Sequence, residues 1–201
     1  MKRTLCVASL LAAGLLAARA WAQQVDIFLG VGTARAGSNG QKIDTFGDGT
    51  LYSTPSLGGT FSDFGASVFI GPQFGASWTM TWRAAHDYAG LGYRPYFNTF
   101  DAVFQPTKLR THRAWPEFRA GLGFAHVGFD YDDSQLCAQV PGCPSTNHFL
   151  AHAGVAERFY LVRNLFLRPA VDVQYIKHFF PFGRNWVPNY SMSLGYSFGR
   201  E

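Results

Sequence analysis

The sequence lacks any apolar run long enough for a membrane-spanning helix. Such a helix needs about 20 predominantly apolar residues, whereas the longest run here covers only the 14 residues from Leu5 to Ala18. Apolar residues also show almost no helical periodicity over the rest of the chain. These two absences argue against a helical membrane protein and against a helical bundle.

The short apolar run has the flanks of an export signal. Lys2 and Arg3 precede it, and the small-residue pattern Ala20-Trp21-Ala22 follows it. A basic start, a short apolar centre and a small-residue cleavage site are together typical of a secretory signal peptide. We therefore expect residues 1–22 to be removed and residues 23–201 to form one domain.

Charge of either sign is also scarce, at 15% of the chain. Three of the 17 basic residues, Lys2, Arg3 and Arg19, lie in the expected signal, which leaves 14 basic against 13 acidic residues. The formal net charge of +4 therefore gives no reason to expect a nucleic-acid partner.

Cysteine is limited to three residues, of which Cys6 lies in the expected signal. Export to an oxidising compartment favours a disulfide between the other two, Cys137 and Cys143. Closing so short a loop would contribute on the order of 2 kcal/mol. A second segment, Asp44 to Gly49, carries acids that could bind a divalent cation. Asp-Gly pairs are far more often turns, and we expect neither a metal nor a cofactor.

What the sequence does contain is alternation of apolar and polar residues. In residues 73–83, QFGASWTMTWR, the even positions from Phe74 to Trp82 are apolar or aromatic, and the odd positions are not. A period of two is the signature of β-strands with unlike faces. Eight segments show it: 24–34, 59–70, 73–84, 94–106, 114–129, 147–162, 165–178 and 188–199.

The segments between these strands alternate in length. They are long at 35–58, very short at 71–72, medium at 85–93, short at 107–113, long at 130–146, very short at 163–164 and medium at 179–187. An up-and-down meander produces this order when its loops lie at one end and its turns at the other. Bacterial outer-membrane barrels have long extracellular loops and short periplasmic turns, so we expect both termini in the periplasm.

The two faces of the strands differ in chemistry. One face is apolar and is expected to contact lipid through residues such as Phe74, Trp78, Met80, Trp82, Phe100, Leu122, Val171 and Leu194. The other face holds glycines, hydroxyl residues and nearly all the charges, with four arginines, counting Arg83, against five carboxylates, counting Asp26 and Asp63. Six of these charges are expected at middle to lower depth: Asp101, Glu117, Arg119, Arg158, Arg168 and Asp172. Glu157 is the one acid on the apolar face within a strand.

This distribution discriminates between two kinds of barrel. A soluble barrel encloses its apolar face, whereas a barrel in lipid turns that face outward. Eight strands leave an interior just wide enough for side chains, and the charges there must pair because an unpaired buried ion costs several kcal/mol. Aromatic residues near strand ends fit the girdles found at membrane interfaces: Trp82, Tyr96, Trp115, Tyr160, Tyr175, Tyr190 and Tyr196. The sequence thus predicts an all-β, eight-stranded antiparallel up-and-down transmembrane β-barrel behind a cleaved signal peptide.

Two stretches resemble a known family. The last strand resembles the C-terminal signal recognised by the barrel assembly machinery, although three residues follow its final aromatic; its alternating residues are Tyr190, Met192, Leu194, Tyr196 and Phe198. Residues 157–175, ERFYLVRNLFLRPAVDVQY, resemble the sixth strand, turn and seventh strand of the OmpA-like small outer-membrane β-barrel domain family. The resemblance implies a bacterial outer membrane, contact with its lipids and lipopolysaccharide, and insertion by the assembly machinery.

The resemblance specifies fold better than activity, since members of the family include structural anchors, adhesins and narrow pores. We expect a structural or surface-interaction role through the extracellular loops, although the sequence identifies no extracellular ligand. One alternative is a narrow channel gated by exchange of ion pairs among the lumen charges. A less favoured alternative is a lipid A-modifying enzyme that uses a histidine of the rim: His86, His126, His148 or His178. Lipid A deacylases carry a serine shortly after the histidine, and His178-Phe179-Phe180-Pro181 lacks one, so we expect no enzymatic activity.

Overall fold

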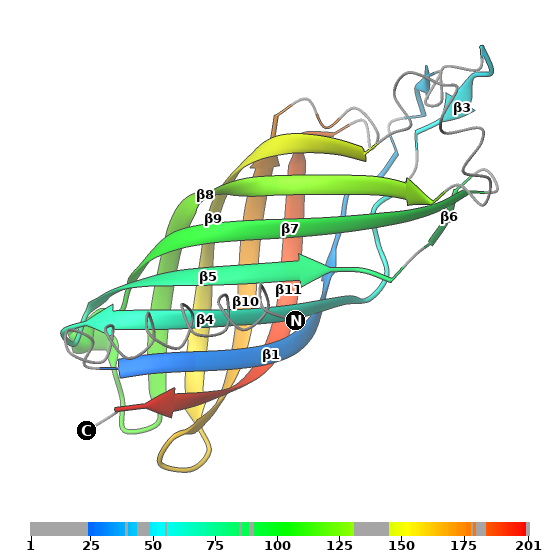
Figure 1. The fold of residues 1–201 in the computed structure, drawn as a ribbon. Coiled ribbons are helices and arrows are strands. Elements are labelled where there is room, and N and C mark those ends of the chain that lie inside the picture. The colour runs from blue at the N-terminus through cyan, green and yellow to red at the C-terminus, as the bar shows by residue number, and fades with distance from the viewer. Residues whose placement is uncertain are drawn as a thin grey trace, which may run out of the picture.

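Eight long antiparallel strands form a closed barrel. The computed structural model describes residues 24–38, 40–43, 49–54, 56–84, 86–88, 91–130, 145–177, 179 and 184–199. The long strands are β1 (Gln24–Ala34), β4 (Phe61–Ile70), β5 (Phe74–Trp82), β7 (Leu91–Phe104), β8 (Ala114–Asp130), β9 (Ser145–Tyr160), β10 (Leu165–Ile176) and β11 (Trp186–Phe198). Their order is β5-β4-β1-β11-β10-β9-β8-β7, and the pairing of β5 with β7 closes the sheet (Figure 1). The eight-stranded antiparallel barrel predicted from the sequence is confirmed, whereas the expected signal peptide lies outside the described residues.

Three short strands lie in segments that the sequence predicted as loops. β2 (Lys42–Ile43) and β3 (Tyr52–Ser53) form a hairpin within the first long connection, and β6 (His86–Tyr88) pairs with the start of β7. Strands of two or three residues are too short to show a period of two, so no pattern in the sequence predicts them. They lie at the loop end of the barrel, where β3 and β6 are labelled in Figure 1.

The opposite end of the barrel carries the three short turns. Gly71 has a positive φ of 79°, which lets the chain reverse tightly between β4 and β5. Residues 105–113 contain the 3-10 turn η1 (Thr107–Leu109), and residues 161–164 join β9 to β10. No helix in the described part of the chain is long and apolar enough to cross a membrane.

Strands β7, β8 and β9 are longer than a membrane requires. They contain 14, 17 and 16 residues, whereas a spanning strand needs about 9 to 11. Their extra length lies towards the loop end, where β7 reaches β6 (Figure 1). At the loop end, β7, β8 and β9 would therefore project beyond the membrane that the barrel spans.

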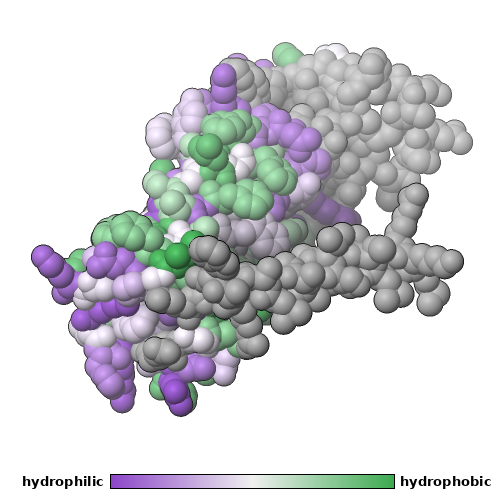
Figure 2. All heavy atoms as spheres, turned by 60° about the vertical axis from the view of Figure 1, so that its left-hand side comes forward, coloured by the Kyte–Doolittle hydropathy of each residue, from purple (hydrophilic) through white to green (hydrophobic). Residues whose placement is uncertain are grey.

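The outer wall is apolar at middle height. Cross-strand pairing places Trp78 beside Phe100 and Phe100 beside Leu122, so they form one row over three strands. Phe74, Phe100, Leu122, Val171 and Leu194 are exposed on this wall, whereas Trp78, Met80 and Trp82 are partly covered by neighbouring side chains. Figure 2 shows apolar residues gathered on the wall (green) and hydrophilic residues at the lower left of the molecule (purple).

One polar residue of this wall has an internal partner. Asn98 points outward from β7, and its Oδ1 accepts a hydrogen bond of 3.3 Å from Trp78 Nε1. An unpaired amide in hydrocarbon would cost several kcal/mol. The pairing with Trp78 therefore explains how Asn98 is accommodated among apolar neighbours.

Candidate functional site

The barrel interior holds the six charged residues that the sequence placed there. Asp101, Glu117, Arg119, Arg158, Arg168 and Asp172 are each 5% exposed or less. They sit at alternate positions of β7 to β10, and glycines opposite them provide the space. Gly154 pairs with Arg119 on one side and with Asp172 on the other, and a Cβ atom built there would overlap the Asp172 carboxylate.

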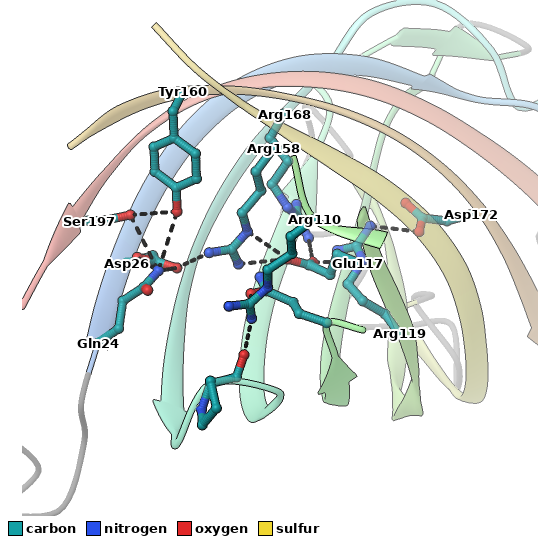
Figure 3. Close-up of polar contacts among 12 residues, drawn as sticks. Gln24, Asp26, Arg110, Glu117, Arg119, Arg158, Tyr160, Arg168, Asp172 and Ser197 are labelled. Atoms are coloured by element: carbon teal, nitrogen blue, oxygen red, sulfur yellow. Dashed lines mark hydrogen bonds and ion pairs between the residues drawn. The ribbon is translucent and has the colours of Figure 1, made fainter. Parts of the chain in front are cut away.

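Glu117 is the centre of the ionic network (Figure 3). Arg158 donates from Nε to Glu117 Oε2 over 2.7 Å, and its Nη2 lies 2.6 Å from the same oxygen. Arg168 donates from Nη2 to Glu117 Oε1, and Arg119 Nε lies 3.6 Å from that oxygen. One carboxylate thus balances parts of three guanidinium charges in a place without solvent access.

A lower branch of the network reaches the turn end. Arg158 also donates to Asp26, which accepts a hydrogen bond of 2.8 Å from Gln24 Nε2. The Tyr160 hydroxyl lies 3.3 Å from Ser197 Oγ beside this pair (Figure 3). The interior is therefore filled by side chains from Glu117 down to the first residues of β1.

An upper branch links two further carboxylates through a histidine. Arg119 Nη2 donates to Asp172 Oδ1 over 2.6 Å. His152 lies between Asp101 and Asp172, with Nδ1 at 2.7 Å from Asp101 Oδ1 and Nε2 at 3.3 Å from Asp172 Oδ1. Asp63 accepts a hydrogen bond of 2.6 Å from Ser193 Oγ.

The charges that were expected to balance inside the barrel do not all belong to one network. Five buried carboxylates face three buried arginines and His152, because Arg83 lies apart from the network. Arg83 donates to the carbonyl oxygen of Gly58, and its guanidinium carbon lies 5.7 Å from the centroid of the Tyr93 ring. Arg83 therefore contributes its charge near the loop end, beside Phe61 and Tyr93, and not to the network around Glu117.

Aromatic rings cover the guanidinium groups. The Arg168 guanidinium carbon lies 4.5 Å from the Phe28 ring centroid, and that of Arg158 lies 4.8 Å from Phe69 and 5.1 Å from Phe166. Each distance is within the range of a cation–π interaction. The rings limit the movement of both arginines and exclude water from the layer around Glu117.

Trp115 and Tyr160 belong to this interior. Both were expected in an interfacial girdle, and that expectation was wrong. Their rings lie 5.0 Å apart, Tyr160 is 5% exposed, and the Arg110 guanidinium carbon lies 4.2 Å from the Trp115 ring. Both residues occupy the alternate strand positions whose side chains form the polar, inward face. Their side chains therefore point into the barrel, even though both residues lie near a strand end.

An apolar cluster fills the interior at the loop end. Its twelve buried residues are Ala34, Ala36, Leu57, Phe61, Tyr93, Phe97, Ala125, Val127, Leu150, Ile176, Phe179 and Val187. Phe61 and Phe97 stack with ring centroids 5.9 Å apart. This face was expected to hold glycines, hydroxyl residues and charges, and the cluster corrects that expectation at the loop end. The interior is closed at two levels, by ion pairs below and by apolar side chains above.

The remaining predicted sites are only partly described. Cys137, Cys143, His178 and the acids Asp44 and Asp48 lie outside the described residues.

The described rim histidines have specific neighbours. His126 Nδ1 lies 2.7 Å from Asn147 Oδ1, and the His126 ring stacks on Tyr96. His148 packs edge-on against Phe179. Within the described ranges, no group of three or more histidine, cysteine, aspartate or glutamate residues is arranged to hold a metal ion.

Comparison with solved structures identifies the architecture. Ail, the attachment invasion locus protein of Yersinia pestis, is 14% identical, with 87% of this chain and 98% of that chain covered and a TM-score of 0.55. Neisserial surface protein A is 13% identical, with 86% and 95% covered and a TM-score of 0.55. The N-terminal barrel domain of Pseudomonas aeruginosa OprF is 14% identical, with 88% and 98% covered and a TM-score of 0.55. No protein-family profile matches the sequence, and no curated protein does. The chain has the fold of the small outer-membrane barrels, as the resemblance of its last strands predicted.

Proposed function

We propose that this chain is a non-conducting barrel of the bacterial outer membrane that holds its loops at the cell surface for a structural or interaction role. The observation that carries the proposal is the closure of the interior at two levels. Glu117 and Arg158 are 0% exposed in the lower level, and so are Phe61 and Leu150 in the upper level. The outer wall is suited to lipid, the interior is filled, and three strands project beyond the membrane. These features together suit a barrel that anchors its loops at the cell surface.

The channel alternative has less support. A water-filled pore requires solvent-accessible residues along its length, and both closed levels would have to move apart to create one. Opening the lower level would separate Glu117 from three arginines, and an unpaired buried charge costs several kcal/mol. Exchange of partners within the network could occur without opening a path for ions.

The enzyme alternative also has little support. Catalysis by a rim histidine requires a nucleophile or a substrate group within hydrogen-bond reach. The described neighbours of His126 are the amide of Asn147 and the ring of Tyr96. We propose that the protein is neither an enzyme nor dependent on a cofactor.

Its partners follow from the anchor role. Outer-membrane lipids and lipopolysaccharide would surround the apolar wall, and the barrel assembly machinery would recognise the outward residues of β11 during insertion. Those residues are Tyr190, Met192, Leu194, Tyr196 and Phe198, all exposed on the outer wall. Ail carries attachment and invasion in its name and was crystallised with a heparin analogue, so a barrel of this fold can present a binding surface.

Two measurements test the anchor role. In planar bilayers, the refolded chain is expected to give no single-channel current above background, because both levels of the interior are closed. An epitope tag inserted after Gly49, between β2 and β3, is expected to bind antibody on intact cells. Steady current steps, or a tag that is reached only after the outer membrane is broken, would contradict the proposal.

A further inference from the structure

A hollow of about 380 Å³ lies on the outer wall at the turn end of the barrel. Its lining residues are Val162, Arg163, Asn164, Leu165 and Tyr196. Leu165 pairs with Tyr196 across β10 and β11, so the upper part of the hollow is continuous with the apolar wall. The lower part is the turn between β9 and β10.

The apolar part of the hollow is open to its surroundings. Val162 is 67% exposed, and the neighbouring Leu161 is 56% exposed. Side chains this apolar at the end of a strand would lie where acyl chains meet headgroups if the wall is in a membrane. The hollow therefore faces lipid more readily than water.

The polar part of the hollow contains an acceptor without a partner. Asn164 is held by its backbone, since Ser197 N donates to its carbonyl oxygen over 2.8 Å. Its Nδ2 donates to the Tyr196 hydroxyl over 3.3 Å. Its Oδ1 is buried and has no hydrogen-bond partner among the described residues. A buried acceptor in this state is stabilised by a ligand that brings an N–H or O–H group.

We propose that this hollow binds the headgroup of a glycerophospholipid in the periplasmic leaflet. Arg163 would pair with the phosphate, because a guanidinium matches phosphate oxygens in geometry and charge. A headgroup ammonium or hydroxyl would donate to Asn164 Oδ1, and an acyl chain would lie along Leu165 and Tyr196. The site rests on the proposed function, since it requires the wall to be in a membrane.

The neighbouring turn adds positive charge. Lys108, His112 and Arg113 lie in residues 105–113, and the three short turns contain no acid. Tyr160 N donates to the Arg113 carbonyl oxygen over 2.8 Å, so this turn adjoins the end of β9. Basic clusters at a membrane surface attract anionic lipid. Phosphatidylglycerol should therefore bind best, and phosphatidylethanolamine next.

Native mass spectrometry of the refolded full chain in detergent tests the site. We expect bound phosphatidylglycerol and phosphatidylethanolamine to survive detergent removal, and phosphatidylcholine, whose headgroup has no hydrogen-bond donor, to be retained several-fold less. Arg163→Gln should lower the affinity for phosphatidylglycerol about tenfold, the effect of losing one charge-assisted contact. The matched control Arg113→Gln, on the adjoining turn outside the hollow, should lower it only about threefold, because it removes general attraction of charge and no contact within the hollow. Equal losses in both variants, or phosphatidylcholine bound as tightly as the others, would overturn the proposal.

A second variant separates the headgroup contact from general attraction of charge. Asn164→Ala should remove the preference for phosphatidylethanolamine over phosphatidylcholine, two zwitterionic lipids that differ in their hydrogen-bond donors, while keeping the phosphate contact; an unchanged preference would overturn the proposal. Insertion of each protein into vesicles is checked first by protease protection. If the unaltered chain fails to insert, the membrane barrel itself is wrong; if it inserts and Arg163→Gln or Asn164→Ala has no effect on lipid retention, only the site is wrong.

Discussion

Replacing Glu117 with glutamine is expected to lower the free energy of unfolding by about 3 to 5 kcal/mol. Glutamine keeps the shape of the side chain but removes the charge that Arg119, Arg158 and Arg168 share. Glu117, Arg158 and Arg168 are at most 1% exposed, so water cannot replace the lost carboxylate. The remaining carboxylates Asp26 and Asp172 each contact only one of the three arginines.

The matched control is Glu157→Gln. Glu157 pairs with Pro116 in the adjacent strand, one position from Glu117, but it points to the outer wall. Removing a charge that faces lipid should leave the free energy of unfolding unchanged within about 0.5 kcal/mol, or raise it slightly. Both values come from urea titrations of protein refolded in vesicles, followed by tryptophan fluorescence. Similar losses in the two variants would show that the network around Glu117 does not stabilise the barrel.

Replacing Leu122 with arginine is expected to cost about 2 to 4 kcal/mol of folding free energy in vesicles. Leu122 lies in the middle row of the outer wall beside Phe100, and an arginine there would face the centre of the acyl layer. The same substitution at Leu161, beside the turn, should cost only about 0 to 1 kcal/mol, because a charge near the interface reaches water and phosphate.

Leu122 and Leu161 make a matched pair because both are 56% exposed. In water, an arginine at either exposed position would change stability by less than about 0.5 kcal/mol. Only a surrounding membrane gives the two positions different costs. Urea titrations of both variants in vesicles measure the difference, and equal small effects would contradict the assignment of the wall to lipid.

The barrel could be predicted because its signal is local. Alternation within each strand, as from Phe74 to Trp82, assigns residues to faces without knowledge of the partner strand. The alternating lengths of the connections then assign the long loops to one end of the barrel and the short turns to the other. The parity also placed Asp101, Glu117 and Arg119 inside, where the structure finds them.

The composition of the network could not be read from the sequence. Asp26 was predicted on the polar face, but its contacts, like those of His152, depend on the height of one strand relative to another. Asp26 meets Arg158 from across the interior, 132 positions away in the chain, and His152 lies between carboxylates of β7 and β10. Register is set by many cross-strand pairs together, and a single strand does not contain it.

The apolar cluster at the loop end has a signal in the sequence. Tyr93 and Phe97 share the odd parity of Asp101 along β7, and Ala125 and Val127 share that of Arg119 along β8. Because β7 and β8 extend towards the loops, the same alternation continues there and points these four side chains into the barrel. Tyr93 lies in the segment 85–93 that was predicted as a connection, whereas Phe97, Ala125 and Val127 lie within predicted strands, where they place apolar side chains on the polar face.

Fluorescence quenching of Trp78 by phospholipids with brominated acyl chains shows whether the apolar wall of the barrel faces lipid. A variant of residues 23–201 that keeps only Trp78, with Trp82, Trp115 and Trp186 changed to phenylalanine, should lose most of its emission in such vesicles. A second variant that keeps only Trp115, which packs inside against Tyr160, should lose little. Quenching of Trp115 with unchanged emission from Trp78 would place the apolar wall inside the barrel and contradict this account.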